Sequence, residues 1–330
     1  MKQKSIVCIG GGTGTFVTLQ GLKIYPYNVS AIVTMSDSGG SNKRIRDEFG
    51  LLPTSDIRQC FIALADENGG AGLLRKLFMY RFEKGNGISG MTFGNLFMAA
   101  LADILGSQEE AIKQTGKVLR ITGKVIPVSF TDTNLFAQYE NGLVVTEENL
   151  IDEPVHDGTL QITNLYLKPE AKVNPEALTA IKHADLIVLG PGDLYTSLLP
   201  NLLVEGVTDA IKTSKGKKVY VMNLMTKYGQ TYNYKASDHV HILEKYIGQS
   251  LDYVLINTEE YPQEVEQRYE AAMEFPVVDD LDQKSYYTVV RKPIAGKQLI
   301  QKAKTDMLKR SLIRHDSEKL ARELDRIVHI

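Results

Sequence analysis

The sequence predicts an α/β fold: a mostly parallel β-sheet in three layers, with helices on both faces. Short apolar runs of strand length alternate along the chain with longer segments of helical period. A cluster of glycines joins the first of these runs to the first helical segment. With 330 residues, of which 43% are hydrophobic, the chain is long enough to bury a substantial core.

The expected strands are continuous apolar runs, which is the pattern of strands that helices cover on both faces. The first run ends at the glycine cluster, and loops rich in polar groups follow later ones. The strands expected in the parallel sheet are residues 5–9, 29–35, 186–189, 219–222 and 253–257.

Apolar residues at helical spacing mark the expected helices. We expect Ser55 to be the N-cap of a helix that runs to Ala65, with Asp56 near the positive end of the helix dipole. The last helix has apolar residues at i, i+4, i+7 and i+8 counted from Leu320, so one of its faces should pack inward. Further helices are expected at residues 16–24, 237–247 and 262–273.

Two regions depart from the alternation of strands and helices. Residues 66–123 have a mostly helical pattern, and we expect a helical insertion there. Residues 124–167 contain short strands, and Asn141-Gly142 is a typical hairpin turn, so a small β-hairpin region is expected. Because no internal repeat, low-complexity tract or long linker interrupts the chain, we expect a single domain over residues 1–330, with a Rossmann-like sheet at its centre.

Charge and composition exclude several classes of protein. The 38 Lys+Arg and 40 Asp+Glu residues give a formal net charge of −2, so a polybasic surface for nucleic acid is not expected. No apolar run approaches the ~20 residues of a membrane span, and the apolar stretch after Met1 is too short for a signal peptide. Two cysteines, Cys8 and Cys60, make no disulfide framework and are expected in the core. We therefore expect a soluble cytoplasmic protein.

The run Gly10-Gly11-Gly12-Thr13-Gly14 directly follows a predicted strand and opens a predicted helix. Glycines allow a tight turn and bring backbone N–H groups against a phosphate at the helix N-terminus. The alternative is a tight turn that binds nothing. The position at the end of the first strand favours the seat of a nucleotide diphosphate.

The nucleotide is not fixed by this loop alone. The dinucleotide fingerprint G-x-G-x-x-G, counted from Gly10, requires a glycine where Thr15 stands, and no Gly-Lys follows as in the P-loop. Asp37 ends the second predicted strand, where a nicotinamide enzyme has its ribose-binding acid. A nicotinamide oxidoreductase therefore stays open as an alternative.

A second loop combines small residues, hydroxyls, acids and arginines. Such a set suits a phosphate site with a divalent cation, because carboxylates ligate hard cations and guanidinium groups fork onto phosphate oxygens. The alternative is that the arginines lie on solvated helix faces, paired with Asp47 or Glu48. The candidates are Asp37, Gly39, Gly40, Ser41, Arg44, Arg46, Asp56 and Arg58.

Two later loops also follow predicted strands. Ligand sites in open α/β sheets form beyond the carboxyl ends of the strands, so these loops should lie near the first two. Asn223 ends one of these strands, and His239 comes soon after, although a lone histidine is more often structural than catalytic. The candidates of the other loop are Gly190, Pro191, Gly192, Asp193, Tyr195 and Thr196.

Seven motifs in order resemble the CofD-like proteins, and most of all their YvcK branch, the gluconeogenesis factors. Tyr269 and the run Arg314-His315-Asp316-Ser317 are similar to the C-terminal signature of that branch. The seven motifs are residues 10–14, 37–41, 53–58, 93–96, 190–201, 223–226 and 238–240.

The resemblance implies a function and a site. CofD moves a phospholactyl group from a guanosine diphosphate donor to a deazaflavin alcohol with Mg²⁺, whereas the YvcK branch is associated with UDP-sugars such as UDP-N-acetylglucosamine, with cell shape and with gluconeogenic growth. The resemblance implies Mg²⁺ at Asp37 and Asp56, and the diphosphate over the glycine loop. Asn95 and the loop 190–197 would complete the pocket, while Tyr269 and Arg314 would contact the nucleoside or the sugar.

The sequence also departs from this family pattern. Ser41-Asn42-Lys43, Ser55 and Gln230 stand where Ser-Ser-Gly, Gly and Glu are usual, and Asp193 replaces a serine. A carboxylate at Asp193 that faced the phosphates would need a cation or an arginine beside it. The departures favour nucleotide binding over transferase chemistry.

We therefore expect a UDP-sugar-binding regulatory protein without turnover, with a Mg²⁺-dependent CofD-like transferase as the alternative. No tightly bound organic cofactor is expected. Further expectations are a homodimer, an unidentified regulatory protein partner, and phosphorylation of Ser317, taken as exposed near the start of the last helix.

Overall fold

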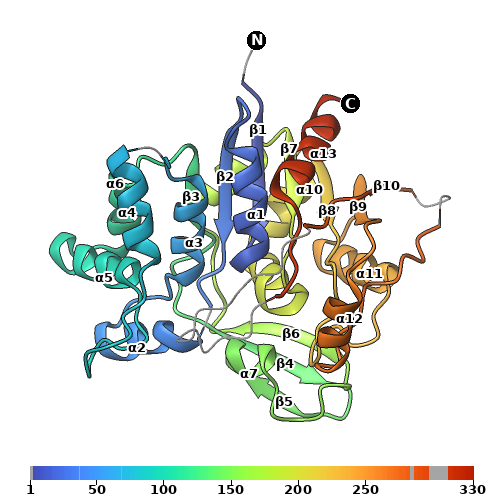
Figure 1. Cartoon of the computed structure of the whole chain (residues 1–330), viewed down its shortest axis with the longest axis horizontal. Helices are drawn as coiled ribbons and strands as arrows, with labels where there is room; N and C mark the ends of the chain where they lie inside the picture. Colours follow the sequence, from blue (N-terminus) through green and yellow to red (C-terminus); the bar gives the residue numbers. More distant parts are fainter. Residues whose placement is uncertain (1–2, 37, 68, 283–285, 297–310) are drawn as a thin grey trace.

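The protein is described here by a computed structural model that covers residues 3–36, 38–67, 69–282, 286–296 and 311–330. A seven-stranded sheet in the order β10-β9-β8-β7-β1-β2-β3 forms its centre, and every neighbouring pair is parallel (Figure 1). Its strands are β1 Ser5–Gly10, β2 Asn28–Val33, β3 Lys124–Pro127, β7 Leu186–Leu189, β8 Lys217–Val221, β9 Tyr253–Asn257 and β10 Thr288–Lys292. This confirms the predicted α/β class.

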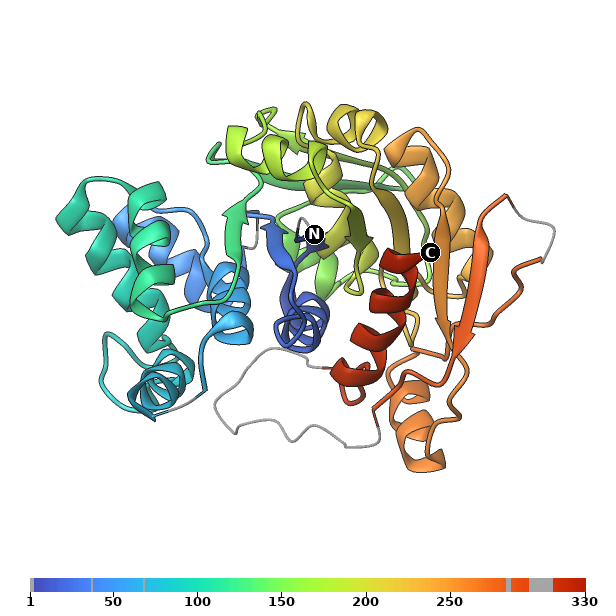
Figure 2. The same cartoon turned by 90° about the horizontal axis from the view of Figure 1, so that it is seen from above.

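Helices cover both faces of the sheet. Successive residues of β1 alternate between two cores: Ile6 and Cys8 pack on one side, Val7 and Ile9 on the other. Seen from above, α1 and the C-terminal helix α13 lie on one side of the sheet, and the helices of residues 175–213 lie on the other (Figure 2). The first face carries α1 Gly12–Leu22, α3 Ser55–Leu64 and α13 Ser317–His329; the second carries α8 Pro175–Lys182, α9 Leu199–Leu202, α10 Val207–Thr213 and α11 Ala236–Ile247.

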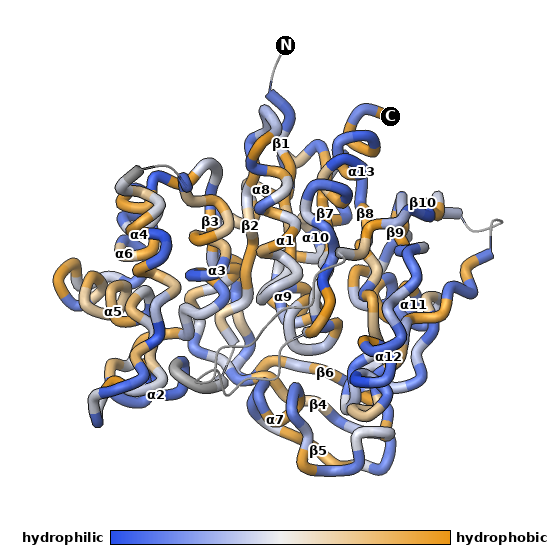
Figure 3. Tube along the Cα trace, in the orientation of Figure 1, coloured by the Kyte–Doolittle hydropathy of each residue, from blue (hydrophilic) through white to orange (hydrophobic). Residues whose placement is uncertain are grey.

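The predicted inward face of the last helix is confirmed. Hydrophilic and hydrophobic segments alternate along α13 in Figure 3, and Leu320, Leu324 and Ile327 are at most 2% exposed. Two backbone carbonyls near the end of α13 accept hydrogen bonds from lysine side chains, from Lys4 just before β1 and from Lys217 of β8. The C-terminal helix is therefore fixed to the sheet by apolar packing and by polar contacts.

The helical expectation for residues 66–123 is also confirmed. Three helices, α4 Gly69–Met79, α5 Phe93–Leu105 and α6 Gln108–Val118, lie at one side of the sheet in Figure 1, above α2 Gly40–Phe49. Phe78, Met98 and Ile112 join them to the core on the α1 side of the sheet. Both cysteines, Cys8 and Cys60, are buried there, as expected.

The short strands expected from 124 to 167 divide between two sheets. β3 pairs with β2 in the main sheet, whereas β4 Asn134–Tyr139, β5 Val144–Thr146 and β6 Ile162–Lys168 form a separate antiparallel sheet. The predicted Asn141-Gly142 turn connects β4 to β5, with Gly142 at a φ of +85°. The short helix α7 Glu148–Asp152 follows β5 and lies against the carboxyl edge of the main sheet in Figure 1.

The expected N-cap at Ser55 is wrong. Ser55 is the first helical residue of α3, and the cap position belongs to Thr54, whose side chain makes no capping hydrogen bond. Instead, Asn42 of α2 accepts hydrogen bonds at Oδ1 from the N–H groups of Thr54 and Ser55, both at 3.3 Å. Asp56 does lie in the first turn, as predicted. A side chain from another helix, which local sequence cannot reveal, supplies the cap.

Among the described residues, no helix has both the length and the apolar character needed to cross a membrane.

The remaining helix, α12 Gln263–Glu270, packs with the segment that enters α13 through a small apolar cluster around Val265 and Tyr269. Another short helical segment, the π-helix η1 Leu194–Leu198, follows β7.

Candidate functional site

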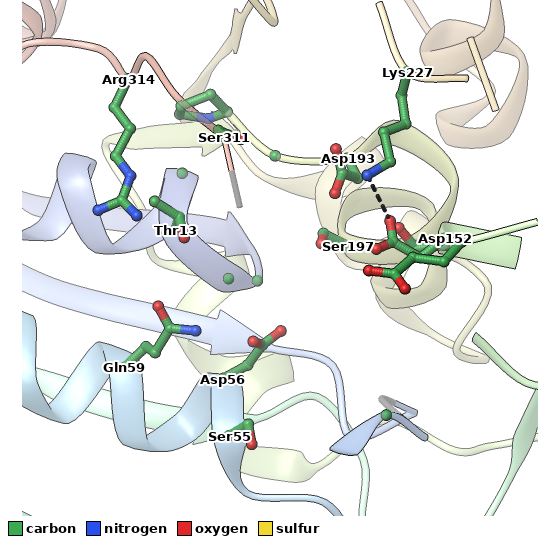
Figure 4. A pocket seen from close by; sticks show the side chains of 18 of the residues that line it. Thr13, Ser55, Asp56, Gln59, Asp152, Asp193, Ser197, Lys227, Ser311 and Arg314 are labelled. Atoms are coloured by element: carbon green, nitrogen blue, oxygen red, sulfur yellow. Dashed lines mark ion pairs between the residues drawn. The ribbon is translucent and has the colours of Figure 1, made fainter. Parts of the chain in front are cut away.

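A cleft of about 810 Å³ opens where the strands β1, β7 and β8 end. Residues from widely separated loops line it, as expected for the carboxyl edge of an open parallel sheet. Figure 4 shows ten of these residues with labels. The lining residues that the sequence predicted are Gly11, Gly12, Thr13, Gly14, Gly39, Arg44, Asp56, Arg58, Pro191, Gly192, Asp193, Thr196, Asn223, Tyr269 and Arg314.

The glycine loop turns β1 directly into α1. Gly11 is the extended N-cap residue, and Gly12 begins the helix with a φ of +61°, which favours glycine because it has no Cβ. The first turn of α1 contains no acidic residue. Gly12, Thr13 and Gly14 line the cleft, so the positive end of the α1 dipole lies at the cleft, which suits an anion such as a phosphate.

The second glycine loop packs against the first. A Cβ on Gly14 would overlap the Pro191 carbonyl, 2.5 Å from its carbon and 3.0 Å from the Gly192 nitrogen. The Asn223 side chain donates a 2.9 Å hydrogen bond to the Gly192 carbonyl, and Asn201 donates to the Gly10 carbonyl at 3.3 Å. The two loops thus form one rigid wall of the cleft.

Asp56 and Ser197 face the glycine loop from opposite elements. A Cβ on Gly11 would overlap the Asp56 carboxylate and would lie 3.6 Å from the Ser197 Cβ. Asp56 comes from the first turn of α3 and Ser197 from η1. A carboxylate and a hydroxyl are therefore held within contact distance of the predicted diphosphate seat.

The arginines of the second loop have different surroundings. Arg44 lines the cleft and donates to the Ser89 carbonyl at 3.0 Å. Arg46 is paired with Asp132 at 2.6 Å, so its partner is neither Asp47 nor Glu48. Arg58 lines the cleft, is 7% exposed and donates to the Asn95 side chain at 3.1 Å.

Several predicted site residues do not line the cleft. Asn95 is fully buried and bonds to Arg58 and Ser55, so it can position cleft residues but not contact a ligand directly. Tyr195 is 1% exposed and its hydroxyl lies 3.0 Å from that of Tyr234, within the core. Gly10 at the end of β1 and Gly190 directly after β7 are also outside the cleft lining. Asp37 and the side chain of Ser41 fall outside what the structure describes, and so does the environment of Gly40.

Asp193 has the neighbouring cation that its charge requires. The pKa of Asp193 is raised to about 6, mainly by burial and also by the nearby carboxylates of Asp152 and Glu274, while Lys227 lowers it. Burial lowers the pKa of Lys227, but the three carboxylates outweigh this and raise it above its usual value. The Lys227 ammonium lies 3.5 Å from the Asp152 carboxylate, as Figure 4 shows. Gln230 donates to the same Asp152 oxygen at 3.0 Å.

Tyr269 and Arg314 both line the cleft, in different ways. The Tyr269 hydroxyl accepts hydrogen bonds from the N–H groups of Leu312 and Ile313, at 2.9 and 3.3 Å, so it holds the segment that carries Arg314. An antiparallel bridge between Ala295 and His315 fixes the other side of this segment. Arg314 points toward the start of α1 beside Thr13 in Figure 4.

Comparison with known proteins agrees with this architecture. The model of the family described as 2-phospho-L-lactate transferase CofD matches residues 6–295. The chain belongs to the CofD family. It is 39% identical to a gluconeogenesis factor of Bacillus subtilis over 97% of both chains, and 42% identical to one of Halalkalibacterium halodurans over 85% of both. A crystal structure of a Bacillus halodurans protein matches it with a TM-score of 0.87 and 37% identity, over 98% of this chain and 99% of that one.

Sequence reasoning missed several cleft residues of this CofD-family protein, among them Asp152, Lys227 and Glu274. Lys227 follows β8 by only a few residues, so the rule that sites form at strand carboxyl ends could have identified it. Asp152 reaches the cleft from α7, the short helix that follows the separate antiparallel strand β5, and no local signal in the sequence predicts that placement. Ser317 is the first residue of α13 but is half-buried, not exposed as expected.

Two buried histidines should make the stability of this CofD-family protein fall on acidification. Burial lowers the pKa values of His239 and His315 to about 4, against ~6.5 in an unfolded chain. Between these values the unfolded chain binds more protons, so folding stability rises with pH, by roughly 2 kcal/mol per histidine between pH 5 and 7. The melting temperature should therefore be lower at pH 5 than at pH 7. This difference should be smaller in His239→Gln than in the wild type.

The matched control for this measurement is His241→Gln, because His241 is exposed on the same helix, α11. Its pH dependence should equal that of the wild type. The comparison between variants also separates the histidine effect from that of Asp193, whose raised pKa acts in the opposite sense. Equal slopes for His239→Gln and the wild type would show that His239 does not contribute.

Proposed function

We propose that this protein is a regulatory factor that binds a nucleotide sugar of the UDP-N-acetylglucosamine type without turning it over. The observation that carries the proposal is the cleft at the carboxyl edge of the sheet, where the open first turn of α1 meets a second glycine loop and Arg314. Backbone N–H groups and a guanidinium are the donors that a diphosphate prefers.

The size of the cleft supports a ligand larger than a phosphate. Its volume of about 810 Å³ falls within the ~300–1,000 Å³ of typical small-molecule sites. Apolar side chains such as Val17, Met91 and Leu224 line it together with the polar groups. A nucleoside could pack on the apolar side chains while its diphosphate bonds to the polar groups.

The proposal includes Mg²⁺ with the diphosphate. The Asp56 carboxylate is packed directly over the Gly11 backbone, which is where the diphosphate would lie. Mg²⁺ is commonly held by one or two carboxylates together with ligand phosphates and water, so Asp56 fits this role. The described residues contain no group of three His, Cys, Asp or Glu side chains that could hold a metal ion by themselves. Bound there, Mg²⁺ would neutralise charge on the diphosphate.

The biological role that we propose follows the relatives. The gluconeogenesis factor of Bacillus subtilis is similar to this chain over 97% of both chains. We propose that this protein likewise acts in gluconeogenic growth and in the control of cell shape, in the cytoplasm. A partner protein would then respond to the nucleotide-bound state.

Calorimetric titration tests the proposal. Purified protein should bind UDP-N-acetylglucosamine saturably, and more tightly than GDP or NAD, because the ligand fills the cleft beyond the diphosphate. Each titration is run with and without Mg²⁺, and Mg²⁺ should tighten binding through Asp56. Failure to bind any uridine nucleotide would contradict the proposal.

The match to the CofD family favours one second candidate, a Mg²⁺-dependent transferase at the same diphosphate seat. In that case GDP should bind in preference to UDP-N-acetylglucosamine and should require Mg²⁺. The same titrations therefore distinguish the two functions. Preferred binding of NAD would instead revive the oxidoreductase alternative.

A further inference from the structure

A group of charged side chains lies at the side of the cleft away from Arg314. Lys227, Asp152, Asp193 and Ser197 lie together in Figure 4, whereas Arg314 and Thr13 lie together on the other side of the view. The charged residues come from three places: the loop after β7, the loop after β8, and the end of α7. The glycine loop thus has the cationic Arg314 on one side and, on the other, a group with more acidic than basic side chains.

The charges of this group disfavour a phosphate. The carboxylates of Asp152, Asp193 and Glu274 line the cleft together with Lys227, and all three raise the pKa of the Lys227 ammonium. A phosphate placed against them would be repelled, and it already has better donors at the first turn of α1. Hydroxyl and amide groups are uncharged and donate hydrogen bonds to carboxylates, so they suit this end of the cleft.

The group is also held in place before any ligand arrives. The Gln230 side chain donates to Asp152 at 3.0 Å and to the Thr196 hydroxyl at 3.2 Å, and both Gln230 and Thr196 are at most 3% exposed. The Lys227 ammonium lies 3.5 Å from the same Asp152 carboxylate. Fixed side chains lose little conformational entropy when a ligand binds, which increases the affinity that each contact contributes.

We infer that Asp152, Asp193 and Lys227 bind the sugar end of the nucleotide sugar, through its hydroxyl and amide groups, and so determine which sugar is accepted. This inference rests on the proposed function and deepens it. The diphosphate would lie over the glycine loop, the nucleoside toward Arg314, and the sugar against this group. The Lys227 ammonium offers donors to the sugar, and the carboxylates of Asp152 and Asp193 offer acceptors.

The test compares ligands with and without the sugar. In Asp193→Asn, the affinity for UDP-N-acetylglucosamine should fall by about tenfold or more, because a charged hydrogen bond is lost. The affinity for UDP should stay the same or rise slightly. Asp152→Asn should behave in the same way. The matched control is Asp103→Asn, an exposed acid of α5 outside the cleft lining, which should change neither affinity.

Several outcomes would overturn this inference. Equal losses for UDP and UDP-N-acetylglucosamine would mean that Asp193 acts on the diphosphate or on the fold, and thermal melting of each variant would identify the latter. An effect that occurs only with Mg²⁺ present would indicate a cation site instead. Unchanged affinities for both ligands in both variants would remove the group from the site. If the wild type bound no uridine nucleotide at all, the proposed function itself would fail.

Discussion

Replacing Arg314 by alanine is expected to weaken the binding of UDP-N-acetylglucosamine by about 10- to 100-fold. A hydrogen bond to a charged group contributes roughly 1.5–3 kcal/mol, and each ~1.4 kcal/mol is a tenfold change in affinity. Arg314 lines the cleft beside Thr13 at the start of α1, where the diphosphate and nucleoside would lie. Calorimetric titration of the variant against the wild type measures the loss.

The surroundings of Arg314 allow a well-controlled experiment. The backbone around Arg314 is fixed on two sides. The Gly296 N–H donates a 2.7 Å hydrogen bond to the Arg314 carbonyl, and the Tyr269 hydroxyl accepts hydrogen bonds from the two residues before Arg314. The substitution should therefore leave the segment in place and remove only the side chain. Arg314→Lys keeps the charge but loses the planar fork, and its affinity should be intermediate.

Arg322→Ala serves as the matched control, because Arg322 is exposed on α13 and does not line the cleft. It should bind the ligand like the wild type. Similar losses for UDP and UDP-N-acetylglucosamine in Arg314→Ala would assign Arg314 to the nucleotide portion, in agreement with the proposed orientation. Undiminished binding would remove Arg314 from the site.

The parts of the fold that sequence could predict are those set by local pattern. Strands such as Leu186–Leu189 and Tyr253–Asn257 match the prediction residue for residue, because continuous apolar runs bounded by polar loops have few alternatives in an α/β chain. The sequence predicts no strand at β10, and it predicts short strands in the region of β6 without giving β6 its own bounds. β10 is only partly buried and lies at the edge of the sheet, so its residues show no strong apolar pattern.

The site divides in a similar way. Glycine loops and strand ends identify the wall of the cleft, since the carboxyl ends of parallel strands meet at one edge. Side chains that come from other parts of the fold are not identified. Asp152 comes from α7, the helix that follows the separate antiparallel strand β5, and Asn42 of α2 caps α3. Tyr195 shows the opposite error. It belongs to a loop of the cleft but points into the core, because direction within η1 depends on its π-helical geometry.

Gly14→Ala is expected to destabilise the protein by about 3 kcal/mol, the upper end for an overpacked site, and to weaken nucleotide binding as well. The added Cβ would overlap the Pro191 carbonyl, and the atoms in its way belong to the backbone, which cannot move aside by rotating a side chain. The two glycine loops would have to separate. Thermal melting should show a decrease of several degrees, and titration with UDP a loss of affinity.

Gly87→Ala is the matched control. Gly87 is exposed, and no atom lies within 4 Å of the position that its Cβ would take. It should melt at or slightly above the wild-type temperature, because alanine reduces the freedom of the unfolded chain. If Gly14→Ala behaved like this control, the close approach of the two loops would not exist in solution.

Gly12 and Gly14 have different roles within one glycine cluster. Gly12 has a positive φ and opens toward the cleft, so it serves the ligand through the backbone N–H groups of α1. Gly14 faces Pro191, so it serves the contact that joins β1 and β7 beyond their ends. Glycines are therefore needed in this loop for two reasons: Gly12 for binding the anion, and Gly14 for the close packing of the two glycine loops that form the wall of the cleft. If Gly14→Ala lost UDP binding while α1 stayed intact, the contact between Gly14 and Pro191 would be necessary for the α1 backbone to bind the anion.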